Sequence, residues 1–397
     1  MTLEKLISVA REQGASDLHL EPGLPAALRV RGTLRTFGEA VSPAKLVEFA
    51  REVVGNQHWP EFAERHSFDL SKTISGVRCR INVMQTARGV GFAIRLLSTF
   101  QATIENLNLH PDLKKIVNAT NGLVLMSGPT GSGKSSTMAA MVQEINLSDD
   151  ARHVITLESP IEYIFRPRHA FIRQREIGRD TPSFEQALLD ALREDPDVLM
   201  VGEMRDPQTM RLTLNAAETG HLVMATVHSS TCTEALQRVV GAFPSEIQNA
   251  VAAQLADSLV AVIAQRLRFR PDLNIRVPEC EILIPTIPIK TFIRNREFFK
   301  INQVMETGAE AGMWTFARYQ SWLNKRTSWH LPSAADEAPD SEPAEAAGLP
   351  AMERTALRPA KPNVPPIAVP AATGVVAPIE IEPIEGGLET VLRKLGS

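Results

Sequence analysis

The sequence predicts an α/β protein in three parts: a mixed α+β domain, a second domain built on a mostly parallel sheet, and a flexible tail. Short apolar runs alternate with helical segments from about residue 112 to residue 330. A glycine-rich loop joins one of these runs to a helix. Residues 331–397 hold 11 of the 27 prolines and no aromatic residue. We therefore expect domains at 1–110 and 111–330, with the tail at 331–397.

The first domain mixes a helical pattern with strand patterns. Residues 3–13 carry apolar side chains at helical spacing, whereas residues 17–20 and 27–34 alternate apolar and polar side chains as half-buried strands do. Residues 78–84 and 91–97 are expected to form a further pair of strands with their arginines on one face. The segment 99–108 is expected to join the two domains.

The second domain contains four short apolar runs, at residues 123–126, 153–157, 198–201 and 222–226. Runs of this length and composition are typical of parallel strands that helices cover on both faces. The tail is rich in Ala, Glu and Pro and cannot bury enough surface to fold alone. Four apolar residues near its end recur at helical spacing: Leu388, Val391, Leu392 and Leu395. A passive extension and a helix that docks on a partner both remain open.

The composition excludes several classes of protein. A net charge of -4 gives no general attraction to nucleic acid, and no basic stretch is interleaved with aromatic residues. The three cysteines, Cys79, Cys232 and Cys280, are far apart in the sequence, so a reducing cytoplasm is the expected compartment. Neither a signal peptide nor an apolar run of about 20 residues is found.

Residues 128–135 match the phosphate-loop pattern G-x-x-x-x-G-K-[ST] in full. Glycines let several backbone N–H groups point at one phosphate chain, and the following helix adds its partial positive charge. Lys134 supplies a cation, and the Ser135 hydroxyl can reach Mg²⁺. The sequence therefore predicts a site for ATP or GTP, formed by Gly128, Pro129, Thr130, Gly131, Ser132, Gly133, Lys134, Ser135 and Ser136.

Three further blocks follow this loop. Glu158 ends one predicted strand, at the edge where ligands of open α/β sheets bind. Glu203 ends another and can orient or deprotonate a water molecule, or bind Mg²⁺ through water. His221 and His228 flank a third strand. Each residue alone is more often structural, but their order after a complete phosphate loop favours a catalytic interpretation.

Taken together, these blocks resemble the secretion-type hexameric ATPases, and the PilT-like retraction motors of type IV pili in particular. Residues 156–163 look like the family's acidic box, 198–203 like its Walker B strand with Gly202 where many NTPases have Asp, and 221–228 like its histidine box. Residues 14–20 resemble the opening of its PAS-like domain. Residues 288–294 stand at its retraction motif, and 307–315 resemble its final helical element. The resemblance covers residues 1 to about 325.

The resemblance implies a PAS-like domain, a RecA-like P-loop ATPase domain, and a cytoplasmic homohexamer that associates peripherally with the inner membrane. The implied cofactors are ATP and Mg²⁺, the latter held by Ser135 and Glu203. An inner-membrane pilus platform protein is the implied partner, and a second pilus motor ATPase is a further candidate; no nucleic acid is expected. Four arginines would act across a subunit interface. The implied catalytic residues are Glu203, Glu158, His228, Arg78, Arg80, Arg88 and Arg95, with His221 beside the nucleotide.

Two departures bear on function. Ser159 stands where the family usually has Asp and cannot bind a metal as a carboxylate would. Lys290 replaces an Arg of the retraction motif and loses its bidentate geometry. A chain that opens on the PAS-like block and lacks a four-cysteine zinc loop nevertheless favours a retraction motor. The alternatives are an extension or type II secretion ATPase, and a non-hydrolysing accessory scaffold, against which intact Lys134 and Glu203 argue.

Overall fold

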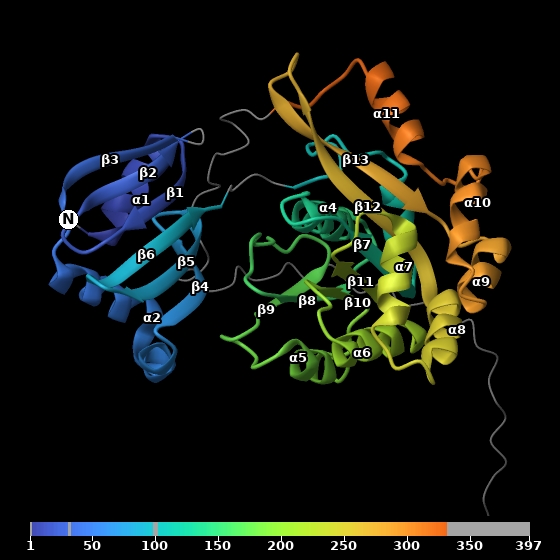
Figure 1. Ribbon diagram of the computed structural model, residues 1–397, viewed down its shortest axis with the longest axis horizontal. Helices are drawn as coiled ribbons and strands as arrows, with labels where there is room; N and C mark the ends of the chain where they lie inside the picture. The colour runs from blue at the N-terminus through green and yellow to red at the C-terminus, as the bar shows by residue number, and fades with distance from the viewer. Residues whose placement is uncertain (1, 31–32, 98–101, 332–397) are drawn as a thin grey trace, which may run out of the picture. The chain divides into compact units, whose positions relative to one another are not determined.

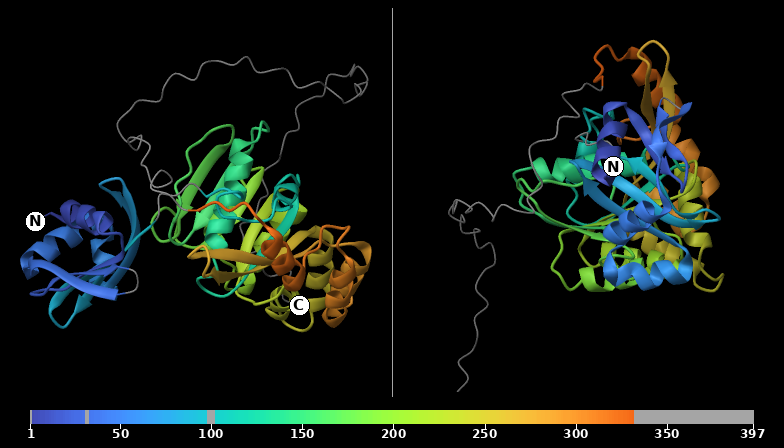
Figure 2. Two further views of the ribbon diagram at one scale, coloured as in Figure 1. Left: turned by 90° about the horizontal axis from the view of Figure 1, so that it is seen from above. Right: turned by 90° about the vertical axis from the view of Figure 1, so that its left-hand side faces the viewer.

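The computed structural model describes residues 2–30, 33–97 and 102–331, and these form two sheets, each with its own helices (Figures 1 and 2). The apolar stripe predicted near residue 390 lies outside the described residues. No helix in the described ranges is long and apolar enough to cross a membrane. The three cysteines are buried and unpaired.

The first sheet has six antiparallel strands in the order β3-β2-β1-β6-β5-β4. Helices α1 and α2 pack against it through one buried apolar cluster. This arrangement confirms the α+β pattern expected of the first domain. The elements are α1 (Leu3–Glu12), β1 (Ala15–Leu20), β2 (Pro25–Val30), β3 (Thr33–Ala40), α2 (Pro43–Arg65), β4 (Ser67–Ile74), β5 (Val77–Thr86) and β6 (Gly89–Leu96).

The arginines of β5 and β6 share the other face of this sheet, as predicted. Along β5 the buried residues alternate with partly exposed ones, so Ile81 joins the core while Arg78 and Arg80 point away from it. Arg80 pairs directly with Arg95 of β6, which places these two side chains next to each other on the same face.

Helix α2 was not predicted, and residues 27–34 form two strands rather than one. Gly55 has a φ of 74° and interrupts α2, so the apolar spacing before it does not continue after it. The helix starts where the Ser42 hydroxyl accepts a hydrogen bond from Lys45 N at 3.4 Å. The predicted strand covers the end of β2 and the start of β3, since alternation of apolar and polar residues does not show where one strand ends and the next begins.

The second sheet has seven strands in the order β13-β12-β7-β11-β10-β8-β9. All neighbouring strands are parallel except β12 and β13. The four predicted strands are confirmed as β7 (Gly122–Ser127), β8 (His153–Glu158), β10 (Val198–Val201) and β11 (Leu222–Val227). The others are β9 (Phe171–Glu176), β12 (Leu259–Arg270) and β13 (Ile275–Leu283).

Helices cover both faces of this sheet, as Figure 1 shows. Leu123 and Leu125 of β7 pack with α5, α6, α7 and α8, whereas Val124 and Met126 pack with α3, α4 and α11. The helices are α3 (Leu113–Val117), α4 (Lys134–Leu147), α5 (Phe184–Ala191), α6 (Pro207–Glu218), α7 (Cys232–Gly241), α8 (Gln248–Ser258), α9 (Ile287–Arg294), α10 (Ile301–Thr307) and α11 (Phe316–Lys325).

The last described residues hold the segment that precedes α3. The buried side chain of Asn108 pairs with the backbone of His330 in both directions: Nδ2 donates to His330 O, and His330 N donates to Oδ1, each at 2.9 Å. Tyr319 of α11 accepts a hydrogen bond from His110 N at 2.9 Å. The chain around residue 330 is therefore bound to the segment that follows the first domain.

Candidate active site

The carboxyl edge of the parallel sheet brings most of the predicted site residues together. The phosphate loop follows β7, Glu158 ends β8, Glu203 follows β10, and His228 follows β11. These four strands are parallel and adjacent in the order β7-β11-β10-β8, so their carboxyl ends lie at one edge. This is the edge where ligands of open α/β sheets bind.

The phosphate loop requires glycine where it crosses β12. Gly128 has a φ of 148°, and a Cβ on it would lie 2.4 Å from Gln265 O. Gln265 also fixes the loop through its side chain, since Nε2 donates to Ser132 O at 2.8 Å and Oε1 accepts from Thr137 Oγ1 at 2.7 Å. Gln265 was not predicted as a site residue from the sequence. Its signal was a polar residue within the apolar run that forms β12.

The loop fits a polyphosphate. Lys134 Nζ donates to Gly128 O at 2.8 Å and to Pro129 O at 3.0 Å, so its ammonium is held inside the loop. Burial lowers the pKa of Lys134, and Glu203 opposes that effect. The Ser132 hydroxyl is buried without a hydrogen-bond partner, and no side chain caps α4, which begins at Lys134. Orphaned donors beside a cation are what a phosphate chain would satisfy.

Ser135 and Ser136 occupy the first turn of α4 after this lysine. Ser135 is exposed, and its hydroxyl is the group of this turn that would hold Mg²⁺, an ion that neutralises phosphate charge when bound. The described residues contain no cluster of three or more His, Cys, Asp or Glu able to bind a metal. Ser136 Oγ lies 2.7 Å from the Tyr163 hydroxyl and joins α4 to the segment after β8.

His228 lies between Glu203 and Lys134. Its Nε2 is 2.8 Å from Glu203 Oε1, and its Nδ1 is 3.5 Å from Lys134 Nζ. A carboxylate on Nε2 and an ammonium at Nδ1 favour the tautomer with its proton on Nε2. Arg205 Nη2 forms an ion pair with the other carboxylate oxygen at 2.7 Å. Burial raises the pKa of Glu203, but Arg205 and His228 outweigh it, so the pKa is lowered and Glu203 is ionised at neutral pH.

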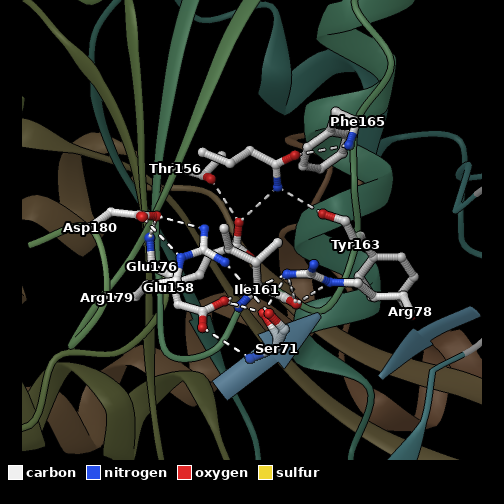
Figure 3. A network of polar contacts seen from close by, with 11 residues as sticks. Ser71, Arg78, Thr156, Glu158, Ile161, Tyr163, Phe165, Glu176, Arg179 and Asp180 are labelled. Atoms are coloured by element: carbon white, nitrogen blue, oxygen red, sulfur yellow. Dashed lines mark hydrogen bonds and ion pairs between the residues drawn. The ribbon is translucent and has the colours of Figure 1, made fainter. Parts of the chain in front are cut away.

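Glu158 is the second carboxyl group at this edge, and Figure 3 shows it among its polar contacts. It is 7% exposed. Its Oε1 accepts from Thr156 Oγ1 at 2.7 Å and from Gln174 Nε2 at 3.1 Å. Burial raises the pKa of Glu158 to about 7, although these two hydrogen bonds lower it. Below about pH 7 the two carboxyl groups therefore differ in charge, which suits different roles.

The four predicted arginines have different surroundings. Arg78 contacts Ile161 O and the carboxylate of Glu176. Arg95 forms an ion pair with Asp17 at 3.0 Å within the first domain. The other two are Arg80 and Arg88. Within the described ranges their side chains form no ion pair, and their action across a subunit interface stays a prediction.

The structure separates His221 from the other predicted residues. It precedes β11, whereas His228 follows the same strand, and Leu222 pairs with Gly122 at the start of β7. Six strand residues span roughly 20 Å, so His221 lies at the opposite edge from the phosphate loop. Its Nδ1 is 3.0 Å from Ala216 O, an interaction that holds the end of α6.

The two departures from the family pattern are both near the surface. Ser159 is exposed directly after β8, beside the buried Glu158. Lys290 lies on α9, where its Nζ is 3.5 Å from Asp257 O. Arg294, one turn further along this helix, forms an ion pair with the Asp257 carboxylate. Neither side chain hydrogen-bonds to the phosphate loop within the described ranges, although Ser159 follows Glu158 at the same edge of the sheet.

Comparisons with known proteins agree with this arrangement. A family model described as Type II/IV secretion system protein matches residues 1–306. The Type IV pilus retractation ATPase PilT of Pseudomonas aeruginosa is 39% identical over 317 residues, which are 79% of this chain and 92% of that protein. The Type IV pilus ATPase PilU of the same organism is 36% identical over 345 residues, which are 86% of this chain and 90% of that protein.

A solved structure is similar over nearly the same extent. The crystal structure of the pilus retraction motor PilT with bound ADP has a TM-score of 0.71 and 36% sequence identity, and the match covers 81% of this chain and 96% of that one. The expected α/β architecture and the expected enzyme class are thereby confirmed. The chain therefore belongs to the Type II/IV secretion system protein family, and it is a nucleotide-binding ATPase of the PilT-like kind found among type IV pilus and secretion ATPases.

Proposed function

We propose that the chain is a cytoplasmic, Mg²⁺-dependent ATPase that works as a homohexameric ring and drives retraction of type IV pili. The observation that carries the proposal is the contact series from Lys134 through His228 to Glu203 at the carboxyl edge of the sheet. It occurs in a chain that matches 92% of the length of PilT.

In this proposal Glu203 acts on the attacking water. Its lowered pKa keeps it ionised, and its two oxygens are held by His228 and Arg205, so the carboxylate has a fixed orientation. An oriented, ionised carboxylate can hold a water molecule and accept its proton. His228 would couple the position of Lys134 to that of Glu203 when Lys134 binds phosphate, because its ring contacts both side chains.

Retraction is proposed on the similarity to PilT over almost the whole of that protein. Force would pass to an inner-membrane platform protein. A second candidate function, cooperation with another pilus motor, is favoured by the comparable similarity to PilU, at 36% identity over 90% of its length. Extension and secretion motors remain alternatives, and so does a non-hydrolysing scaffold.

Two experiments separate these candidates. Steady-state phosphate release by the purified chain tests hydrolysis, and the absence of turnover with ATP and Mg²⁺ would leave only the scaffold. Pilus counts and twitching in a deletion strain test direction. Excess pili with lost motility support retraction, bald cells mean extension, and normal pili with reduced force or speed support the cooperating motor.

The ring is tested by concentration. If arginines of one subunit complete the site of another, turnover per subunit rises with protein concentration as rings form. Light scattering coupled to the activity measurement follows both quantities on the same sample. Full activity of a monomer at every concentration contradicts the shared site.

A further inference from the structure

A buried carboxylate of the ATPase domain takes most of its hydrogen bonds from the first domain. Glu176 ends β9, where it is the strand partner of Glu158, and it is 2% exposed. Its Oε1 accepts from the backbone N–H of Ser71 in β4 at 3.1 Å. Its Oε2 accepts from the Ser71 hydroxyl and from Ile161 N, the latter at 3.1 Å. Figure 3 shows these contacts around Ser71.

Arg78 of β5 completes this cluster. Its Nη2 lies 3.5 Å from Glu176 Oε2 and also donates to the Ser71 hydroxyl. Its Nε and Nη2 donate to Ile161 O at 3.3 and 3.2 Å. The side chain of Arg78 is 11% exposed and that of Glu176 is 3% exposed, so water does little to screen the pair. A buried carboxylate without its cation is strongly disfavoured, so the contact is not incidental.

Both Arg78 and Glu176 bind the segment that follows Glu158. Ile161 donates its N–H to Glu176 and receives two hydrogen bonds from Arg78 on its carbonyl, so both of its backbone polar groups depend on this cluster. Tyr163, two residues later, touches Ser136 of the phosphate-loop helix. Gln174 of β9 holds Tyr163 O at 2.7 Å and Glu158 at 3.1 Å. The segment 159–163 is thereby connected to the first domain at one end and to the nucleotide site at the other.

We infer that Arg78, with Ser71, is a positioning residue that acts within its own chain. It holds the segment 159–163, and with it Glu158, in place at the carboxyl edge of the sheet beside the phosphate loop. Movement of the first domain relative to the ATPase domain would break these contacts and release the segment. Domain movement and the geometry of the second carboxyl group would thus be coupled through one side chain. The inference rests on the proposed ATPase site, which it deepens.

Hydrogen exchange on the nucleotide-free full-length protein tests this inference without relying on turnover. Arg78→Gln removes the cation and the fork of donors, so peptides covering 159–165 are expected to exchange roughly tenfold faster or more. Arg78→Lys keeps a cation for Glu176 but not the fork, and an intermediate rate is expected. Arg80→Gln is the matched control, because Arg80 lies on the same face of β5 but forms no ion pair with any described residue. This variant is expected to leave the exchange of 159–165 unchanged.

A double-mutant comparison separates positioning from general loss of structure. In a Glu176→Gln background no buried charge needs Arg78, so Arg78→Gln is expected to have a smaller effect on the exchange of 159–165 than in the wild type. Peptides from β5 and β6 report whether the first domain stays folded. If Arg78→Gln itself unfolds that domain, Ser71→Ala, which removes only the bridging hydroxyl, is the second variant, and a local increase in exchange is again expected.

Steady-state kinetics and ADP binding give the last test. Because Arg78, Ser71 and Glu176 do not themselves touch the phosphate loop, Arg78→Gln should lower kcat while leaving ADP affinity unchanged. Wild-type exchange at 159–165 in Arg78→Gln, or an equal acceleration in Arg80→Gln, overturns the inference. Lower turnover with unchanged exchange would assign Arg78 to a neighbouring subunit's site instead. If the wild type shows no hydrolysis, the proposed function fails while the exchange result still stands.

Discussion

Replacing Glu158 with Gln should change how the stability of the protein depends on pH. Burial raises the pKa of this carboxyl from 4.5 to about 7, so the folded protein keeps a proton that the unfolded chain has already released. Between these two pH values the folded state binds more protons, and the free energy of unfolding falls as pH rises. The loss is complete above about pH 7.

The size of the effect follows from that difference. One pH unit corresponds to about 1.36 kcal/mol, so the free-energy cost of ionising Glu158 in the folded protein is about 3 kcal/mol. For a domain of roughly 200 residues, each kcal/mol shifts the melting temperature by about 2–4 °C, which gives about 6–12 °C. Glu158→Gln removes the titration, and its amide oxygen can still accept from Thr156 and Gln174, as the carboxyl group does.

Thermal unfolding of the nucleotide-free protein between pH 5 and pH 8 measures this effect. The melting temperature of Glu158→Gln relative to the wild type is expected to rise across this interval. Subtracting the wild-type curve removes the contribution of the other titrating groups. Glu64→Gln, which replaces an exposed carboxyl of α2, controls for the loss of one acidic side chain. Parallel curves for Glu158→Gln and the wild type would refute the assignment of a raised pKa to this carboxyl.

Four further outcomes are expected. Lys134→Ala should abolish ADP binding in calorimetry while the circular dichroism spectrum stays the same; near-normal turnover would contradict the site. Glu203→Gln should keep ATP affinity and lose roughly 10²–10⁴ in turnover, and normal turnover would move the base elsewhere. Arg205→Gln removes a group that lowers the pKa of Glu203, so the acid limb of the kcat profile should move to higher pH. Truncation after His330 should preserve activity and assembly. Truncation after Lys325 removes the backbone partner of Asn108 and should raise hydrogen exchange around residue 108. Equal exchange in the two truncated proteins would show that the Asn108–His330 pairing does not hold this segment.

The sequence by itself determined the fold class and most of the nucleotide site. Parallel strands buried on both faces must be short and apolar, so β7, β8, β10 and β11 were visible as apolar runs. The phosphate loop was visible because its chemistry constrains residue type at fixed spacing. Glu158, Glu203 and His228 were found because strand ends in such sheets converge at one edge.

Features that depend on contacts between distant residues were not visible. Gln265 supports the phosphate loop from a strand more than a hundred positions away, and only the pairing of β12 with β7 brings it there. His221 and His228 look equivalent in sequence, but a strand separates them and places them at opposite edges of the sheet. Helix α2 was hidden because Gly55 breaks the spacing that identifies a helix.

The charge state of each carboxyl group was also decided by tertiary structure. Glu158 and Glu203 both lie at the carboxyl ends of parallel strands, yet burial raises the pKa of Glu158, and Arg205 with His228 lowers the pKa of Glu203. Arg78 and Arg80 are two residues apart on one face of β5, and only Arg78 meets a buried carboxylate. Spacing along the chain identifies which groups reach a given edge or face, but a pKa or an ion pair depends on the groups that folding brings within a few ångströms, and these come from elsewhere in the sequence.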